Sequence, residues 1–214
     1  MTNTIAIPFS KRTTAAVTVF PCLFICGPNG AQALPFTVNS TPAMVPLGSD
    51  NFTRADENPL SDGGKWTVPA DGTPLQVLSD VCVGTAYARC VEAYTGASLP
   101  SNQYAKYRIG ALDTFEADSV FLYTRFNFST TQGYVFELDV QAGGPGNGLA
   151  LLYRDYIGNP LTTPLTITVT TGDVFVLSAV GSAIVVTQNG TPILSGIDST
   201  YTSGSAGLGI EIGD

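Results

Sequence analysis

The sequence predicts an all-β protein: a two-sheet antiparallel jelly-roll sandwich over residues 48–214, preceded by an extended N-terminal arm over residues 1–47. Three observations favour this fold. Short runs of alternating apolar and polar residues recur between turn signals. Glycine (23 residues) and proline (14 residues) are frequent, which favours many turns. No stretch has the 3.6-residue period of an amphipathic helix. A chain of 214 residues is long enough for one such domain and an arm.

The arm has two interpretations. Lys11 and Arg12 precede an apolar run over residues 15–26, and Ala31-Gln32-Ala33 follows it, which is the order of a cleaved secretory signal peptide. The β-branched and aromatic residues of the run also suit an extended arm that adds a strand or packs on a neighbouring subunit. We favour the arm. The run is too short and interrupted to span a bilayer, so no membrane span is expected.

The strands of the domain are predicted from alternation. Residues 165–170 alternate Leu, Ile and Val with Thr, and residues 208–212 alternate Leu and Ile with Gly and Glu. Residues 174–177 and 184–186 are apolar at successive positions, as expected of central strands. Asn189-Gly190 separates two runs, and both residues tolerate positive φ. This dipeptide therefore predicts a β-hairpin.

Composition excludes several functions. Lys+Arg 9 against Asp+Glu 17 gives a net charge of −8, so no basic field exists to bind a nucleic-acid backbone. The chain has no histidine, which excludes His-based triads, His-ligated zinc and His proton shuttles. No cofactor is expected. Calcium is the one metal with candidate oxygen ligands, at Asp71-Gly72 and over residues 113–118.

Cys82 and Cys90 flank a plausible short turn over residues 84–87. A cross-strand disulfide between them is within geometric reach and would persist in an oxidising compartment. The alternative is two buried free thiols.

Residues 50–56 (Asp-Asn-Phe-Thr-Arg-Ala-Asp), with Trp66 downstream, resemble the opening of concanavalin A-like (laminin-G-like) jelly-roll domains. The order of later motifs is also similar: a Tyr-x-Phe-x-Leu strand from Tyr134, an Asn-Gly hairpin, and a glycine-rich closing segment over residues 203–209. The resemblance implies a jelly roll with Trp66 in its core. It assigns no single function, because the superfamily includes lectins, glycosidases, adhesion modules and virion proteins.

The resemblance also bears on catalysis. Glucanases of this superfamily carry Glu-x-Asp-x-(x)-Glu on one strand, and Glu137-Leu138-Asp139 reproduces its first part. Gln141 or Ala142 stands where the second Glu would be, and an amide cannot protonate a leaving group. We therefore expect no enzymatic activity. The simpler interpretation of Glu137 and Asp139 is that they are outward positions of an alternating strand.

A polar face on the hairpin of residues 118–128 and 132–141 is the candidate ligand surface. If the apolar sets of the two strands face the core together, their polar sets share the opposite face. The candidate binding residues are Tyr123, Arg125, Asn127, Glu137 and Asp139. This register places Arg125 beside Glu137, close enough for an ion pair. Such a face could bind a glycan or a partner, or it could simply be solvated.

Three function classes remain. The first is a non-enzymatic structural or adhesive module of a virion or extracellular assembly, docked on other subunits through its arm, with glycan binding as an added role. The second is a secreted, lectin-like carbohydrate-binding domain with a cleaved signal peptide. The third, a glycoside hydrolase, is disfavoured by Gln141.

Overall fold

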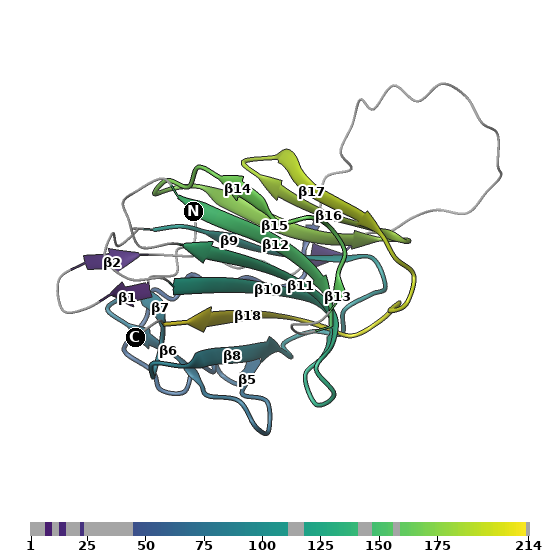
Figure 1. Ribbon diagram of the computed structural model, residues 1–214. Helices are drawn as coiled ribbons and strands as arrows, with labels where there is room; N and C mark the ends of the chain where they lie inside the picture. The colour runs from purple at the N-terminus through teal and green to yellow at the C-terminus, as the bar shows by residue number, and fades with distance from the viewer. Residues whose placement is uncertain are drawn as a thin grey trace.

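The computed structural model describes residues 7–9, 13–15, 22–23, 45–110, 118–140, 147–155 and 159–212. These residues form two large antiparallel sheets that pack face to face, and they contain no helix (Figure 1). The predicted all-β sandwich is confirmed. The described part of the chain accordingly has no helix long and apolar enough to cross a membrane.

The first layer is an eight-stranded sheet whose last strand in sequence lies near its centre. In spatial order its strands are β13 (Asn159–Pro160), β12 (Gly148–Arg154), β11 (Gln132–Val140), β10 (Asp118–Asn127), β18 (Ser205–Glu211), β8 (Arg89–Tyr94) and β5 (Trp66–Thr67). β14 (Leu165–Ile167) also pairs with β12. Because β18 lies between β10 and β8, the C-terminal strand joins segments that are far apart in the chain.

The second layer is a six-stranded sheet. Its strands, in spatial order, are β17 (Thr191–Ile197), β16 (Ala183–Gln188), β15 (Val174–Val180), β9 (Gln103–Arg108), β3 (Cys22–Leu23) and β4 (Val45–Pro46). Two further ribbons are β6 (Leu75–Leu78) with β7 (Val81–Gly84) and β1 (Ile7–Phe9) with β2 (Thr13–Ala15). The chain crosses between the layers from β4 to β5, from β8 to β9, from β9 to β10, from β14 to β15 and from β17 to β18.

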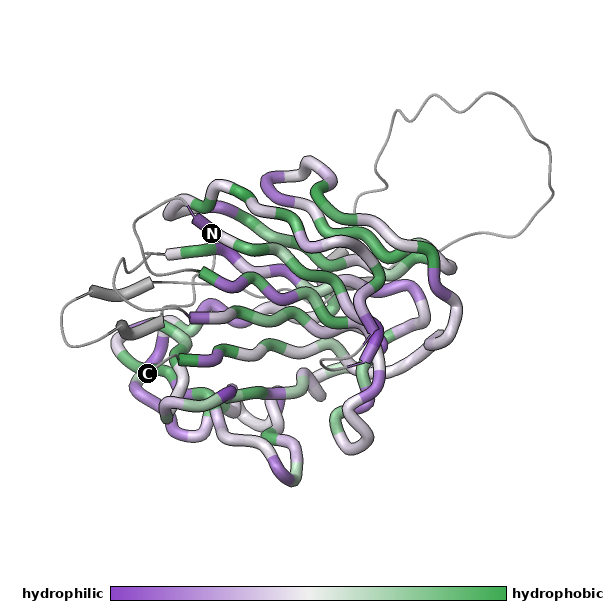
Figure 2. Tube along the Cα trace, viewed as in Figure 1, coloured by the Kyte–Doolittle hydropathy of each residue, from purple (hydrophilic) through white to green (hydrophobic). Residues whose placement is uncertain are grey.

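The core lies between the two layers and is built from buried apolar residues of both sheets. Figure 2 shows that hydrophobic residues recur along the strands of these sheets. Tyr107 of β9 stacks on Phe136 of β11 at 6.3 Å and contacts Phe175 of β15 at 5.3 Å between ring centroids. Phe175 and Leu177 are fully buried, whereas Val174 is partly exposed. The run over residues 174–177 therefore alternates, although its composition predicted burial on both faces.

The opening motif is held by one carboxylate. Asp50 accepts hydrogen bonds from the backbone amide of Phe52 (2.7 Å), from Trp66 Nε1 (2.9 Å) and from Arg54 Nη1 (2.6 Å). Trp66 is buried and meets Tyr94 edge-on at 5.3 Å. The expected role of Trp66 as a core anchor is confirmed.

The predicted Asn-Gly hairpin joins β16 to β17, with Asn189 at φ 52° and Gly190 at φ 83°. Both central residues have positive φ, as a type I′ turn requires.

The predicted disulfide is not formed in this structure. Cys82 and Cys90 are free and buried. The sulfur of Cys90 accepts a hydrogen bond from the backbone amide of Thr85 at 3.3 Å. Burial raises the pKa of the Cys82 thiol well above its ordinary value. The alternative of two buried thiols is the arrangement observed.

Candidate functional site

The outer face of the eight-stranded sheet, opposite the core, carries aromatic, acidic and basic side chains. The cross-strand register aligns its side chains in rows that run from β12 to β8. The first row is Tyr153, Val135, Tyr123, Gly207 and Ala93. The second row is Leu151, Glu137, Phe121, Gly209 and Val91. The third row is Leu149, Asp139, Ser119, Glu211 and Arg89.

An aromatic cluster occupies the middle of this face. Tyr123 lies 4.8 Å from Phe126 and 5.2 Å from Phe128 between ring centroids, and the two phenylalanines are 4.8 Å apart. Tyr123 and Phe126 are buried, while Phe128 is partly exposed. The rings therefore form a mostly apolar floor with an accessible edge.

A β-bulge in β10 places Phe126 in this cluster and removes Arg125 from the face. The register pairs Thr124 with Tyr134 but Asn127 with Gln132, so β10 holds one extra residue there. Arg125 takes a positive φ of 48° at the bulge.

The guanidinium of Arg125 binds backbone carbonyls on the core side of the sheet. Its acceptors are the carbonyl oxygens of Ser101 (2.6 Å), Gly181 (2.8 Å), Tyr201 (3.0 Å) and Ala179 (3.3 Å). Glu137 lies on the outer face and accepts a hydrogen bond from Ser119 Oγ at 3.3 Å. The predicted ion pair between Arg125 and Glu137 is therefore wrong, because strict alternation cannot anticipate a bulge.

Of the predicted site residues, Tyr123, Glu137 and Asp139 share the outer face, and Arg125 does not. Asn127 lies at the end of β10, where its Oδ1 accepts hydrogen bonds from the amide (3.0 Å) and hydroxyl (2.7 Å) of Ser129. Asn127 thus stabilises the β10–β11 turn. Gln141 lies outside the described residues.

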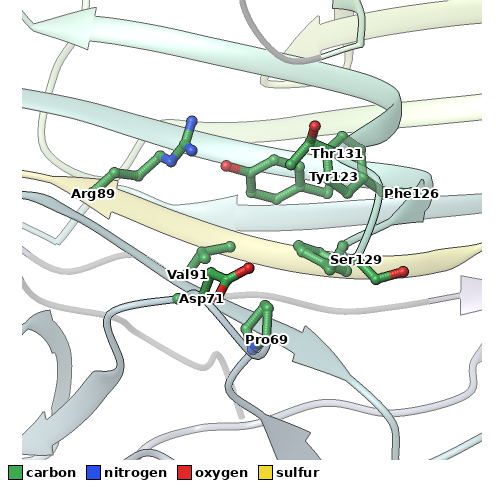
Figure 3. Close-up of a pocket in the computed structure, with 10 residues that line it drawn as sticks. Pro69, Asp71, Arg89, Val91, Tyr123, Phe126, Ser129 and Thr131 are labelled. Carbon is green, nitrogen blue, oxygen red and sulfur yellow. The ribbon is translucent and has the colours of Figure 1, made fainter.

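A cavity of about 200 Å³ opens beside the aromatic cluster (Figure 3). Its lining combines apolar rings, hydroxyls and one charge of each sign: Pro69, Asp71, Gly72, Arg89, Val91, Tyr123, Phe126, Phe128, Ser129 and Thr131. These residues come from the segment before β6, from β8, from β10 and from the β10–β11 turn. We call this cavity the aromatic pocket.

Two glycines of β18 make room for the rings. A Cβ on Gly207 would lie 2.4 Å from the Phe128 ring, and one on Gly209 would lie 3.1 Å from the Tyr123 hydroxyl. Side chains at these positions would therefore displace the pocket floor. Gly207 and Gly209, two residues apart in the glycine-rich closing segment, are the sequence signal that could have revealed it.

Arg89 and Asp71 supply the charged groups of the pocket. The Arg89 guanidinium lies 6.0 Å from the centroid of the Phe121 ring. Burial raises the pKa of Tyr123, an effect that the positive charge of Arg89 partly offsets. Tyr123 therefore remains a neutral phenol at physiological pH.

The two carboxyl groups next to the pocket, Glu137 and Asp139, both have a raised pKa. Burial raises the pKa of Glu137, and the nearby negative charge of Asp139 adds to this effect. Burial also raises the pKa of Asp139. Burial and the charge of Glu137 raise the pKa of Tyr153 to about 12. These groups can accept hydrogen bonds from hydroxyls, and a carboxyl with a raised pKa can also donate a proton.

Metal binding gains no support here. In the part of the chain that the structure describes, no cluster of three or more Asp, Glu, His or Cys side chains could hold a metal ion. Asp71 and Gly72, a candidate calcium loop, line the aromatic pocket instead. The second candidate, over residues 113–118, lies almost wholly outside the described residues.

No protein-family model and no curated protein sequence matches the chain. Solved structures share its fold. The carbohydrate binding module CBM66 from Bacillus subtilis matches with a TM-score of 0.54 and 14% identity, over 72% of this chain and 96% of that one. LamAcat from Zobellia galactanivorans matches with a TM-score of 0.53 and 12% identity, over 78% of this chain and 87% of that one.

LamA from the same organism, solved with laminaritriose and laminaritetraose, matches with a TM-score of 0.50 and 12% identity, over 78% of this chain and 88% of that one. This likeness confirms the jelly-roll sandwich fold that the resemblance implied. At this identity the likeness concerns the fold alone.

Proposed function

We propose that the protein is a non-catalytic carbohydrate-binding module whose ligand binds on the outer face of the eight-stranded sheet. The observation that carries this proposal is the aromatic pocket. The partly exposed ring of Phe128, backed by the buried rings of Tyr123 and Phe126, offers an apolar surface on which the C–H face of a sugar can pack, and Asp71 and Arg89 offer an acceptor and donors for hydroxyls.

The neighbouring carboxylates extend the same surface. Glu137 and Asp139 lie on the rows beside Phe121 and Ser119, where they can accept hydrogen bonds from sugar hydroxyls. In the glucanase pattern that the strand resembles, the first Glu works with the last Glu as nucleophile and general acid. The sequence has Gln141 at the next position of the same alternation, which supports binding without catalysis.

Two structural neighbours support a carbohydrate ligand by analogy. One is named as a carbohydrate binding module, and LamA was solved with laminaritriose and laminaritetraose. The analogy is one of fold, so the pocket of this chain remains the main support.

Substitution of one pocket ring tests the proposal. Screening the full chain on a glycan array should identify bound glycans, and Phe128→Ala should weaken their binding about tenfold or more, because a stacking surface is lost. Tyr87→Ala is the matched control, since Tyr87 is 66% exposed and outside the pocket. An array without bound glycans would overturn the proposal, as would equal loss in both variants.

A hydrolysis assay tests the expectation that the protein is not a catalyst. The full chain incubated with neutral and acidic polysaccharides should release no reducing ends. Release that Glu137→Gln abolishes would identify a glycoside hydrolase and overturn the non-catalytic proposal.

Attachment of this module to a virion or extracellular assembly through residues 1–47 is the second part of the proposal. Its support is the concentration of apolar residues over 15–26 in a segment outside the resembled domain. Such side chains are stabilised by burial against the domain or a neighbouring subunit.

A further inference from the structure

The β6–β7 ribbon packs against the eight-stranded sheet without joining it. β6 contacts β8 and β7 contacts β18, but in the described part of the chain neither strand shares a ladder with either large sheet (Figure 1). Leu75, Val77 and Cys82 of the ribbon are buried in the same hydrophobic cluster as Leu208 of β18. Packing of side chains on the core side of the sheet is therefore the main attachment of the ribbon.

Backbone hydrogen bonds join the ribbon to its neighbours at its outer edge and at its base. At the edge, the amide of Leu60 donates to the carbonyl of Leu75 at 2.8 Å. At the base, the amide of Val91 in β8 donates to the carbonyl of Thr73 at 2.9 Å. The base continues directly into residues 69–72, which border the aromatic pocket. Movement of β6 away from β8 would therefore move this border of the pocket.

A buried carboxyl group lies between β8 and the ribbon. Glu92 of β8 is 0% exposed, and neither of its carboxyl oxygens has a hydrogen-bond partner among the described residues. The backbone amide of Leu75 on β6 lies nearby, and the charge of Glu92 acts on the thiol of Cys82 on β7. Glu92 is thus close to both strands of the ribbon.

The charged groups near Glu92 do not neutralise it. Burial is the main cause of its raised pKa, and the negative charge of Glu57, on the segment that pairs with β6, adds to the rise. Arg54 of the same segment pairs with Asp50 at 2.6 Å and with Glu57 at 2.7 Å. Arg89, the cation of β8, belongs to the outer face and lines the aromatic pocket.

The remaining groups around Glu92 are neutral. β6 (Leu-Gln-Val-Leu) has no titratable side chain, and β18 places Leu208 opposite Glu92. Cys82 and Cys90 are buried thiols, and burial raises the pKa of Tyr94, so that it stays a neutral phenol. An ionised Glu92 would therefore be cut off from water, with no paired cation among the described residues, which is costly.

We infer that ionisation of Glu92 releases the β6–β7 ribbon from the core side of the sheet and moves residues 69–72, at the border of the aromatic pocket, with it. Release exposes the carboxylate to water and removes the cost of burying an unpaired charge. The protonated form has no such cost, so the ribbon stays packed at lower pH. This release does not depend on what the pocket binds.

Linkage gives the direction and the pH range of the release. Burial raises the pKa of Glu92 to about 8 in the packed form, whereas exposure to water in the released form returns it towards its ordinary value of 4.5. The packed form is fully stabilised below pH 4.5 and loses stability as the pH rises towards 8. Within this range, the equilibrium constant for release should rise about tenfold per pH unit.

Amide hydrogen exchange of the full chain, followed by mass spectrometry at pH 6, 7 and 8, tests the inference. In peptides over residues 73–84, the ratio of the exchange rate of the parent to that of Glu92→Gln should rise about tenfold per pH unit, since an amide side chain does not ionise. Comparison at equal pH cancels the intrinsic pH dependence of exchange. At pH 8 the ribbon of the parent should be at least about tenfold less protected than β15 and β16, because it opens without global unfolding.

Asp80→Asn is the matched control. Asp80 is an exposed carboxylate in the turn of the same ribbon, and its φ of 64° is one that asparagine tolerates. Exchange of the ribbon in this variant should equal that of the parent at each pH. The parent alone gives a second test that needs no variant: the protection factors of its ribbon should fall about tenfold per pH unit from pH 6 to 8.

Three results would overturn the inference. The first is a protection factor of the parent ribbon that does not change with pH. The second is an equal effect of Glu92→Gln and Asp80→Asn. The third is equal protection of the ribbon and of β15 and β16 at pH 8, because Glu92 would then act through unfolding of the whole protein. None of these measurements uses a glycan, so failure of the proposed function would leave the inference standing.

Discussion

At the scale of single residues, Arg125 places its charge inside the sandwich. It is 2% exposed, and its guanidinium donates to four carbonyl oxygens that belong to loops and strands of the other layer. Hydrogen bonds from a charged donor are stronger than neutral ones, and buried acceptors without partners are costly. Arg125 therefore stabilises the contact between the two layers.

Replacement of the Arg125 side chain should strongly destabilise the folded protein. Arg125→Met should lower the free energy of unfolding by about 3–5 kcal/mol, because it leaves buried carbonyls without donors. Urea denaturation followed by circular dichroism measures the change. Arg154→Met is the control: Arg154 is half-exposed and pairs with Asp198 at 3.2 Å, so a loss of about 1 kcal/mol or less is expected. A small effect at Arg125 would contradict its structural role.

A second residue couples stability to pH. Glu92 is fully buried on the core side of β8, and burial raises its pKa to about 8, although the nearby backbone amide of Leu75 favours the charged form. The unfolded chain loses this proton near the ordinary pKa of 4.5, while the folded chain keeps it. Stability from this group is therefore complete below pH 4.5 and falls as the pH rises towards 8.

The variant Glu92→Gln should remove this dependence, since an amide does not titrate. We expect it to unfold at similar urea concentrations to the parent at pH 5 and to be more stable by about 2–4 kcal/mol at pH 8. Urea denaturation at the two pH values measures the difference. Equal stability differences at both values would show that Glu92 titrates normally.

At the scale of elements, local turns set the register of the strands around them. The β16–β17 hairpin depends on two residues with positive φ, and the β10–β11 hairpin is capped by Asn127. The bulge just before that turn decides which side chains of β10 face the core and which face the pocket.

The first hairpin provides a clean measure of backbone strain. Gly190 has a φ of 83°, and a Cβ added there would have no atom within 4 Å. Gly190→Ala should therefore destabilise the protein by about 1–2 kcal/mol through conformation alone, whereas Gly190→Asn should recover most of the loss. Thermal denaturation compares the three proteins. Glycan binding should not change, because this hairpin belongs to the opposite layer.

At the scale of the whole molecule, the two layers have different surfaces. The eight-stranded sheet carries the aromatic pocket and its acidic rows, while β3 and β4 extend the six-stranded sheet beside β9. Ligand binding and attachment are thus assigned to different parts of the chain in the proposed function.

Truncation tests that separation. Deletion of residues 1–35 should leave a folded domain that still binds glycans but no longer assembles, because the apolar side chains of the arm are removed. Sedimentation velocity measures assembly, and the glycan array measures binding. Normal assembly of the truncated chain would rule out the arm as the attachment segment.

The sequence by itself determined the features that depend on neighbouring residues. Strand alternation predicted the sandwich, Asn189-Gly190 predicted a hairpin, and the side-chain period of two placed Glu137 and Asp139 on one outer face. Trp66 was expected in the core through the resemblance of its motif, and it lies there.

Only the tertiary structure decided the bulge at Arg125 and the composition of the aromatic pocket. The pocket joins residues 69–72, β8 and the turn after β10, which become neighbours because β18 pairs with both β8 and β10. Such pairings depend on contacts between distant segments, and no local period encodes them. The bulge is equally non-local, because the carbonyls that hold Arg125 lie 24 to 76 residues away in the chain.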